Sequence, residues 1–187
     1  IGYESFVKGP ANTIFYNPSS LFANSKDLGL QFELDWLCKK KAIENAKGLR
    51  PDKKLFIKIM STSIHDNMLR VDHLKELLKK IDVLEKDIVF EIRDEDAFQN
   101  VNFINRIIKM YSGMKFAIAI KNTWEDRNIG FLKAKNVSYI KLDKYFIRDL
   151  DKNSIHNELL KNIMKIAGKV HAGVIAATLS SAMASFL

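Results

Sequence analysis

The chain lacks the residues and segments that mark secreted or membrane proteins. Its 187 residues include one cysteine, Cys38, which excludes an internal disulfide and suits a reducing compartment. Its longest apolar stretches fall far short of the ~20 residues that a membrane helix needs. The first residues are typical of a strand and not of a signal peptide. We therefore expect a cytoplasmic location, as a separate protein or as the cytoplasmic part of a larger one.

The sequence also lacks an initiator methionine, internal repeats, low-complexity segments and an interdomain linker. We therefore expect a single domain over residues 1–187, cut from a longer protein. Apolar residues make up 47% and charged residues 28% of the chain, which is ordinary for a globular domain with a substantial core.

Positive charge is in excess, with 30 lysines and arginines against 22 aspartates and glutamates, for a formal net charge of +8. Such an excess can attract nucleic acid or another polyanion. The lysines at positions 39–41, 53–54 and 79–80 are expected on helix surfaces, however, and no basic stretch is interleaved with stacking aromatics. The sequence therefore argues against a nucleic-acid partner.

Short apolar strands alternate with helical patterns, at the spacing of βαβ units with crossover helices. The alternation predicts an α/β fold with a mostly parallel sheet, either open or closed into a barrel, and periodicity does not decide between the two. The predicted strands cover residues 2–7, 55–60, 88–93, 115–121, 137–142 and 172–177.

The predicted helices have recognisable starts and apolar faces. Asn17 and Pro18 are typical of an N-cap and a first helical residue, and a helical region runs from there to about Ala46 with a break at Gly29. Ser154 is expected to cap the last helix. The inward faces are predicted to hold Val71, Leu74, Leu77, Leu78 and Ile81, then Ala97, Val101, Ile104, Ile108 and Tyr111, and finally Leu159, Leu160, Ile163 and Ile166.

Three charged residues interrupt strands that are otherwise apolar, namely Lys58, Glu91 and Lys141. An unpaired buried charge costs several kcal/mol, roughly, so each of these residues needs a partner. If the strands are parallel neighbours, we expect the three side chains to point into one shared polar pocket.

Seven segments, in order and at matching spacing, resemble the EAL domains that hydrolyse cyclic di-GMP. GYESFVKGP at residues 2–10 is similar to the family's G-Y-E-A-L-x-R-G-P, and YIKLD at 139–143 with FIR at 146–148 matches closely. The other segments are PSSLF at 18–22 with ELDWLC at 33–38, LFIK at 55–58, IVFEI at 88–92, FAIAI at 116–120 and VIA at 174–176. The resemblance covers almost the whole chain.

The resemblance implies the family's modified TIM barrel, in which one of eight strands is antiparallel. This chain supplies six of those strands, because the family's opening strand and its last strand, which carries a Q-G-Y motif, have no counterpart here. We therefore expect a TIM-barrel-like EAL fold with an incomplete or modified barrel.

In the family, water activated by two Mg²⁺ or Mn²⁺ ions attacks the phosphodiester, and carboxylates are the main ligands of the ions. The remnants of that site that the resemblance implies are Glu4, Glu91, Lys141, which orients the water in the family, and Asp143. Family ligands are replaced at Lys58, Lys121, Asn122 and Ala177, and a further motif glutamate is replaced at Ser180. The motif leucine corresponds to Phe6 and the phosphate-contacting arginine to Lys8.

The charges at these positions indicate that the metal site is lost. Three carboxylates would face three ammonium groups, so the pocket is neutral without metal, and ammonium groups among former ligands repel Mg²⁺. We therefore expect no metal or other cofactor and no phosphodiesterase activity. The chain is then a regulatory module of bacterial signalling that contacts other domains of the same protein or a partner protein.

Two alternatives stay open. Lys58 and Lys121 could replace the cations and hold phosphate oxygens, which would make a receptor that binds cyclic di-GMP without cleaving it. The other alternative is a weakly active, metal-dependent cyclic di-GMP phosphodiesterase. The simplest role of the lysines is to pair with the two glutamates. The nucleotide-binding residues of a receptor would be Glu4, Phe6, Lys8, Lys58, Lys121 and Lys141.

The other residues of catalytic type show no pattern of a site. The four histidines lack metal-binding spacing, and Cys38 is expected to pack partly buried on a helix. Trp36 is expected in the core, whereas Trp124 would cover the pocket or contact a partner. The apolar residues 182–187 favour a homodimer as a further option.

Overall fold

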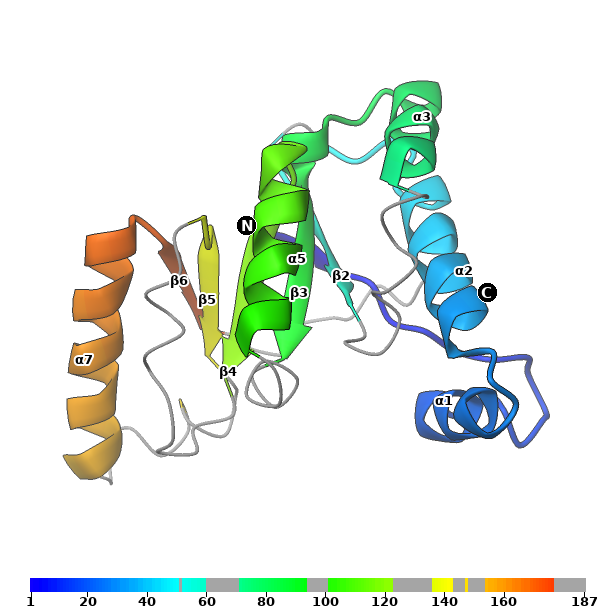
Figure 1. The fold of residues 1–187 in the computed structure, drawn as a ribbon, viewed down its shortest axis with the longest axis horizontal. Helices are drawn as coiled ribbons and strands as arrows, with labels where there is room; N and C mark the ends of the chain where they lie inside the picture. Colours follow the sequence, from blue (N-terminus) through cyan, green and yellow to red (C-terminus); the bar gives the residue numbers. More distant parts are fainter. Residues whose placement is uncertain are drawn as a thin grey trace. The chain divides into compact units, whose positions relative to one another are not determined.

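The computed structural model describes residues 1–50, 52–59, 71–93, 101–122, 136–142, 147 and 154–176. Strands and helices alternate along these residues (Figure 1). The elements are β1 (Gly2–Glu4), α1 (Pro18–Asp27), α2 (Gln31–Glu44), β2 (Lys54–Lys58), α3 (Val71–Ile81), the 3₁₀ helix η3 (Glu85–Asp87), β3 (Ile88–Arg93), α5 (Val101–Gly113), β4 (Ala117–Asn122), β5 (Tyr139–Leu142), α7 (Ser154–Val170) and β6 (Gly173–Ala176).

The strands follow one another across one six-stranded sheet in the order of the sequence. The pairs β1–β2, β4–β5 and β5–β6 are parallel. All six predicted strands are confirmed, with ends shifted by up to three residues, and so is the α/β fold class. Their apolar runs fit this arrangement because strands of a parallel sheet are commonly buried on both faces.

The helical region near the N-terminus begins and breaks where the sequence predicts. The side chain of Asn17 accepts a hydrogen bond from the Ser19 amide at 2.9 Å, and Pro18 is the first residue of α1. Gly29 lies between α1 and α2 with a φ of +69°, in the left-handed region that glycine adopts without strain. The chain can therefore turn sharply between the two helices.

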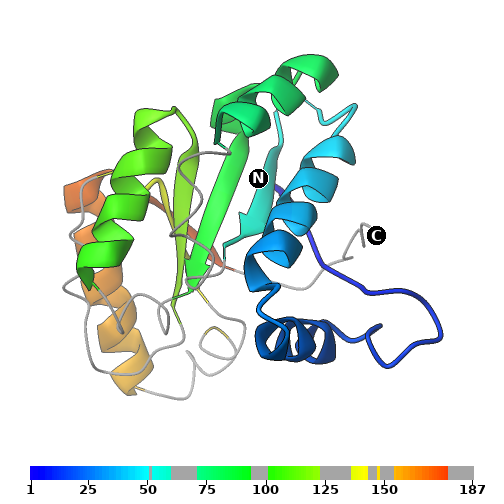
Figure 2. The same ribbon diagram turned by 45° about the vertical axis from the view of Figure 1, so that its right-hand side comes forward.

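The chain divides into two compact units, with the boundary inside β3. In the first, which includes Ile1–Val89, α2 contacts α1 near its N-terminal end and α3 near its C-terminal end (Figure 2). Its core includes Ile43 of α2, Phe56 and Ile57 of β2, and Leu74 of α3, all buried. The rings of Trp36 and His73 lie 6.3 Å apart, but Trp36 is only partly buried.

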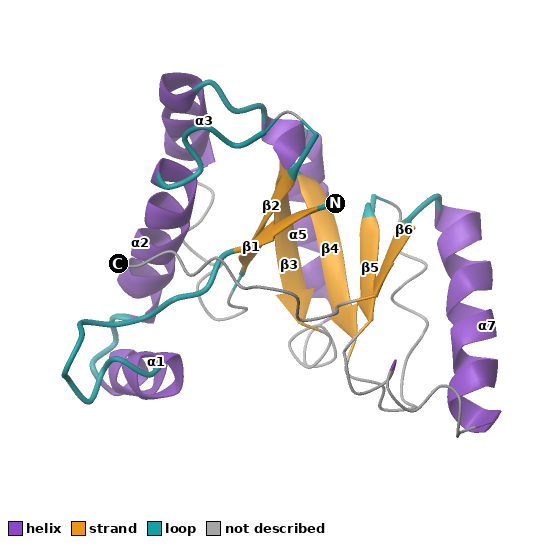
Figure 3. Cartoon of the chain, turned by 180° about the vertical axis from the view of Figure 1, so that it is seen from behind, coloured by secondary structure: helices purple, strands orange, loops and turns teal. Residues whose placement is uncertain are grey.

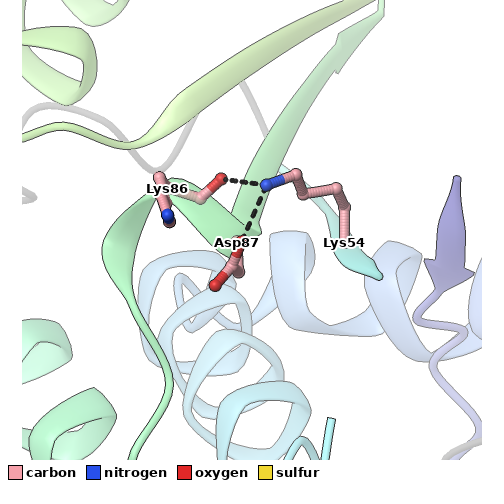
Figure 4. Close-up of polar contacts among 3 residues, drawn as sticks. All are labelled: Lys54, Lys86 and Asp87. Atoms are coloured by element: carbon pink, nitrogen blue, oxygen red, sulfur yellow. Dashed lines mark hydrogen bonds and ion pairs between the residues drawn. The ribbon is translucent and has the colours of Figure 1, made fainter. Parts of the chain in front are cut away.

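The start of β2 is tied to the turn that precedes β3 (Figure 4). The Nζ of Lys54 donates to Oδ1 of Asp87 at 2.7 Å and to the carbonyl of Lys86 at 3.1 Å. Asp87 is buried, so the ammonium supplies the charge that this carboxylate needs away from water.

The second unit begins at Phe90. Within it α5 packs on β4 and α7 lies beside β6 (Figure 3). The rings of Phe90, Tyr111 and Phe116 form a cluster, with centroid distances from Phe90 of 4.4 and 5.1 Å. Tyr111 and Ile108 are buried on α5, as predicted, and Ala97 lies outside the described residues.

The start of α7 differs from the sequence prediction by one position. Ser154 is its first helical residue and not the capping residue before it. The predicted inward face is confirmed, with Ile163 buried and Leu159, Leu160 and Ile166 partly buried.

Three lysines that were predicted on helix surfaces lie elsewhere, because Lys53 precedes β2, Lys54 begins β2 and Lys39 is buried. Lys39 of α2 is fully buried and forms an ion pair with Asp35, which is one turn earlier and also buried. The prediction was wrong because α2 contacts both α1 and α3, so more than one stripe of this helix is covered. A buried pair of this kind depends on both partners, because losing one leaves an uncompensated charge.

We expect Lys39→Met to lower the free energy of unfolding by about 3–5 kcal/mol, because it leaves the Asp35 carboxylate buried without its ammonium. Urea denaturation followed by circular dichroism measures the change. The double variant Asp35→Leu/Lys39→Met should recover most of the loss. Lys40→Met on the same helix is the control, since its pair with Glu44 is exposed and contributes at most about 1 kcal/mol. Equal losses in the two single variants would contradict the prediction.

Candidate functional site

The first pair of predicted site residues meets at the ends of β1 and β2. Glu4 ends β1 and is in register with Phe56, two residues before Lys58 at the end of β2. Because side chains alternate along a strand, the register places Glu4 and Lys58 on the same face. Lys58 Nζ lies 2.9 Å from Glu4 Oε1. The predicted glutamate–lysine contact is therefore present here.

Lys58 is less buried than the sequence suggested. Its side chain is 43% exposed, although its neighbours Ile57 and Ile59 are both buried. The ammonium also lies 4.7 Å from the centre of the Phe6 ring, within range of a cation–π contact. Glu4, Phe6 and Lys58 thus form one partly exposed cluster.

A second lysine–aromatic contact lies in the same segment of the chain. Lys8 Nζ is 5.4 Å from the centre of the Tyr16 ring. The loop between them is closed by a hydrogen bond from the Gly9 amide to the Tyr16 carbonyl at 3.2 Å. Sequence reasoning missed Tyr16, although Gly9-Pro10 ahead of an aromatic pair is a signal that the chain turns back.

In the second unit, Glu91 of β3 and Lys141 of β5 form a buried ion pair. Their side chains are 0% and 8% exposed, and Lys141 Nζ lies 2.8 Å from Glu91 Oε2. Among the described residues, Glu91 Oε1 is buried without a hydrogen-bond donor. The expectation that each strand charge has a partner is met for these two residues, although the simplest interpretation of the sequence paired the glutamates with Lys58 and Lys121.

Lys121 lies beside this pair. Lys121 is on β4, in register with Lys141 on the parallel neighbour β5, so the two side chains project from the same face of the sheet. Asn122 is the last residue of β4, whereas Asp143, Ala177 and Ser180 lie outside the described residues, as do Trp124 and residues 182–187. Within this unit the described charges at the predicted positions are two ammonium groups and one carboxylate.

The first cluster belongs to one unit and the Glu91–Lys141 pair to the other. A single pocket shared by all these residues therefore stays a prediction.

Among the residues that the structure describes, the donor set does not fit a pair of divalent cations. In the part of the chain that the structure describes, no three side chains of histidine, cysteine, aspartate or glutamate converge as metal ligands. Glu4 contacts the ammonium of Lys58, and Glu91 has one oxygen bound to Lys141 and one without a donor among the described residues. Hard cations need several oxygens, which this donor set does not bring together.

The fold places the chain among TIM-barrel-like α/β domains. The sequence profile of the EAL domain family matches residues 1–183, and the chain belongs to this family, which is known for cyclic di-GMP phosphodiesterases. No curated protein matches the sequence. Among the helices that the structure describes, none has the length and hydropathy to cross a bilayer.

Solved structures share the fold at low sequence identity. A standalone EAL protein from Vibrio cholerae O395, bound to cyclic di-GMP, has 21% identity and a TM-score of 0.75, over 95% of this chain and 75% of that one. The FimX EAL domain from Pseudomonas aeruginosa, also bound to cyclic di-GMP, has 23% identity and a TM-score of 0.71, over 88% and 67%. The PaMucR phosphodiesterase in complex with cyclic di-GMP has 16% identity and a TM-score of 0.74, over 93% and 72%.

Cys38 is a poor candidate for a nucleophile. Burial on α2 raises the pKa of its thiol to about 12, and the neighbouring Asp35 carboxylate adds to the rise. The thiolate is the reactive form, so little of it is present near neutral pH. The predicted packing role agrees with this environment.

We expect iodoacetamide at pH 8 to alkylate Cys38 about a hundredfold or more slowly in the folded protein than in the unfolded chain. The raised pKa lowers the fraction of thiolate, and burial limits access of the reagent. Mass spectrometry over time measures both rates. The same chain in guanidinium chloride is the control, since unfolding restores an ordinary thiol. Equal rates in the two states would show that the thiol is neither buried nor raised in pKa.

Proposed function

We propose that this chain is an EAL domain that does not hydrolyse cyclic di-GMP and that acts in the cytoplasm through contacts with other protein domains. The observation that carries the proposal is the ammonium of Lys58 against the carboxylate of Glu4 at 2.9 Å. The family resemblance puts an asparagine metal ligand at position 58 and a glutamate ligand at position 4. A side chain whose oxygen can coordinate a cation has thus been replaced by one whose positive charge repels a cation.

Simple electrostatics indicates the size of this effect. Two unit charges 4 Å apart interact by about 1 kcal/mol in water and by about 4 kcal/mol at an effective dielectric constant of 20. The repulsion between Lys58 and a cation bound by Glu4 therefore cancels most of the attraction that Glu4 supplies. In the second unit, the Lys141 ammonium similarly lies 2.8 Å from Glu91 and opposes a cation there.

The family reaction needs the missing cations for its central step. The cations lower the pKa of the attacking water and stabilise the charge that develops on the phosphate. An ammonium group donates hydrogen bonds and carries one positive charge, but it is not a Lewis acid and does not bind water as a metal does. This supports a module without turnover.

In a hydrolysis assay with cyclic di-GMP and either Mg²⁺ or Mn²⁺, we expect the protein to give no product above the level of its Glu4→Ala variant. Separation of the linear dinucleotide by liquid chromatography measures the product. An active phosphodiesterase of the same family, assayed in parallel, shows that substrate and conditions are adequate. Turnover that depends on Glu4 and on the metal would refute the proposal.

A second candidate function is a cyclic di-GMP receptor that needs no metal. The two lysine–aromatic contacts favour it, because they hold Lys58 and Lys8 at rings in partly exposed positions. An ammonium can bind phosphate as a point charge, and an aromatic ring can stack on a base. Several solved structures of similar fold are complexes with cyclic di-GMP, which makes this nucleotide the ligand to test.

Calorimetric titration with cyclic di-GMP distinguishes the two candidates. A receptor of this kind should bind equally well in EDTA and in Mg²⁺, and Lys8→Met should weaken binding about tenfold or more, because it removes a charge-assisted contact to phosphate. Lys53→Met, which removes an exposed lysine paired with Asp52, is the matched control. Absence of binding heat in both buffers would argue against a receptor and leave protein contacts as the remaining candidate function.

A further inference from the structure

We propose that the exposed face of α2 is an interface between two copies of this chain, which pack α2 against α2 in antiparallel orientation about a two-fold axis at Leu37. The inference does not rest on the proposed function. It rests on leucines that α2 presents at the surface and on charges of opposite sign that lie before and after Leu37 on the same face.

The amphipathic pattern of α2 is partly reversed. Asp35 and Lys39 are buried, whereas Leu37, which lies between them in the sequence, is 42% exposed. With 3.6 residues per turn, Leu37 projects nearly opposite to the two charged residues. The contacts of α2 with α1 and α3 therefore hold an ion pair inside and leave a leucine at the surface.

Three leucines share this exposed face and form what we call the leucine stripe. Leu30, at the N-cap, is 48% exposed, Leu34 is partly buried and Leu37 is exposed. Single exposed leucines are common on protein surfaces. These three differ, because the spacing i, i+4, i+7 aligns them along one side of the helix, as in helices that pack against another helix.

Charges of opposite sign lie before and after Leu37. Glu33, about one turn before it, is exposed. Lys40 and Lys41, about one turn after it, have side chains that are 43% and 45% exposed, with their ammonium groups 3.8 and 3.1 Å from Glu44. Ion pairs this exposed contribute little to stability, so these ammonium groups can also contact a carboxylate of another molecule.

An antiparallel arrangement makes this face complementary to itself. With the axis at Leu37, the two Leu37 side chains meet, and Glu33 of each copy faces Lys41 of the other. Leu34 then lies against the aliphatic stem of Lys40 of the other copy. A parallel arrangement would instead place Glu33 against Glu33 and Lys41 against Lys41, and like charges in contact are unfavourable. The charge pattern therefore favours a second copy in one orientation.

The contact is short, so the association should be weak. The 14 residues of α2 span about 21 Å, and a pair of such helices buries less than the ~1,200 Å² that stable complexes need. We therefore expect a monomer–dimer equilibrium in the micromolar range and not a permanent dimer.

Sedimentation velocity between about 10 µM and 1 mM protein tests the interface, and the mean mass should rise toward that of a dimer. Leu37→Glu should raise the dimer dissociation constant about tenfold or more, because it places two carboxylates together at the axis. Leu84→Glu is the matched control, since Leu84 is 53% exposed in the same unit but lies outside α2. It should associate as the unaltered protein does. Circular dichroism verifies that both variants are folded.

Charge reversal provides a second test with its own rescue. Glu33→Lys and Lys41→Glu should each weaken self-association, because each brings like charges together at two places. An equimolar mixture of these two variants should associate again, and so should the double variant Glu33→Lys/Lys41→Glu, because opposite charges then face each other. Glu76→Lys, at an exposed position of α3, makes the same change in net charge and should have no effect on association.

The inference is overturned if the unaltered protein stays monomeric up to about 1 mM, a concentration far above a micromolar dissociation constant. It is also overturned if Leu37→Glu associates like Leu84→Glu, which would place the contact on another surface, or if mixing the two charge variants restores nothing. None of these measurements involves cyclic di-GMP. Hydrolysis by the unaltered protein would therefore refute the proposed function without affecting this result.

Discussion

The arrangement of charges in this structure depends on one constraint, which is that a carboxylate placed on a strand of the sheet requires a cation within contact distance. Glu4 meets it with Lys58, and Glu91 meets it with Lys141. Asp87, the last residue of η3 before β3, is compensated in the same way by Lys54. In each case the cation is the ammonium of a lysine on a strand of the sheet. The need is physical, because a carboxylate that is removed from water and left uncompensated costs several kcal/mol, roughly.

The two glutamate–lysine pairs differ in burial and therefore in how much each contributes to stability. Glu91 and Lys141 are both buried, so losing either partner would leave a charge stranded in the core of its unit, and stability alone accounts for the pair. Glu4 and Lys58 are partly exposed, and a pair of that kind adds little to stability. The need for compensation is therefore weaker at Glu4 than at Glu91. We propose that the main effect of the ammonium beside Glu4 is on what can bind there.

The sequence predicted most of the secondary structure because its signals are local. Apolar runs marked the buried parallel strands, Asn17 and Pro18 marked the start of α1, and Gly29 marked the break before α2. The failures arise where the environment of a residue depends on distant segments. Asp35 and Lys39 are one helical turn apart, a spacing that usually describes a solvated pair, and only the contacts of α2 with two other helices bury them. The Lys8–Tyr16 contact likewise depends on loop closure and has no periodic signal.

The pairing of Glu4 and Glu91 with lysines was predictable, because a charged residue within an apolar strand needs a partner of opposite charge. The exposure of Lys58 was not predictable, since the residues on either side of it, Ile57 and Ile59, are both buried.

Exchanging a divalent cation for an ammonium separates two tasks that a metal performs together. A metal supplies positive charge that attracts a phosphodiester, and as a Lewis acid it also converts bound water into a nucleophile. An ammonium retains the first property in weaker form, with one charge and with hydrogen-bond donors, and it lacks the second. A domain altered in this way can retain attraction for an anionic ligand while losing the means to cleave it. Because the lysine is covalently attached, that charge is present whatever the concentration of free divalent cations.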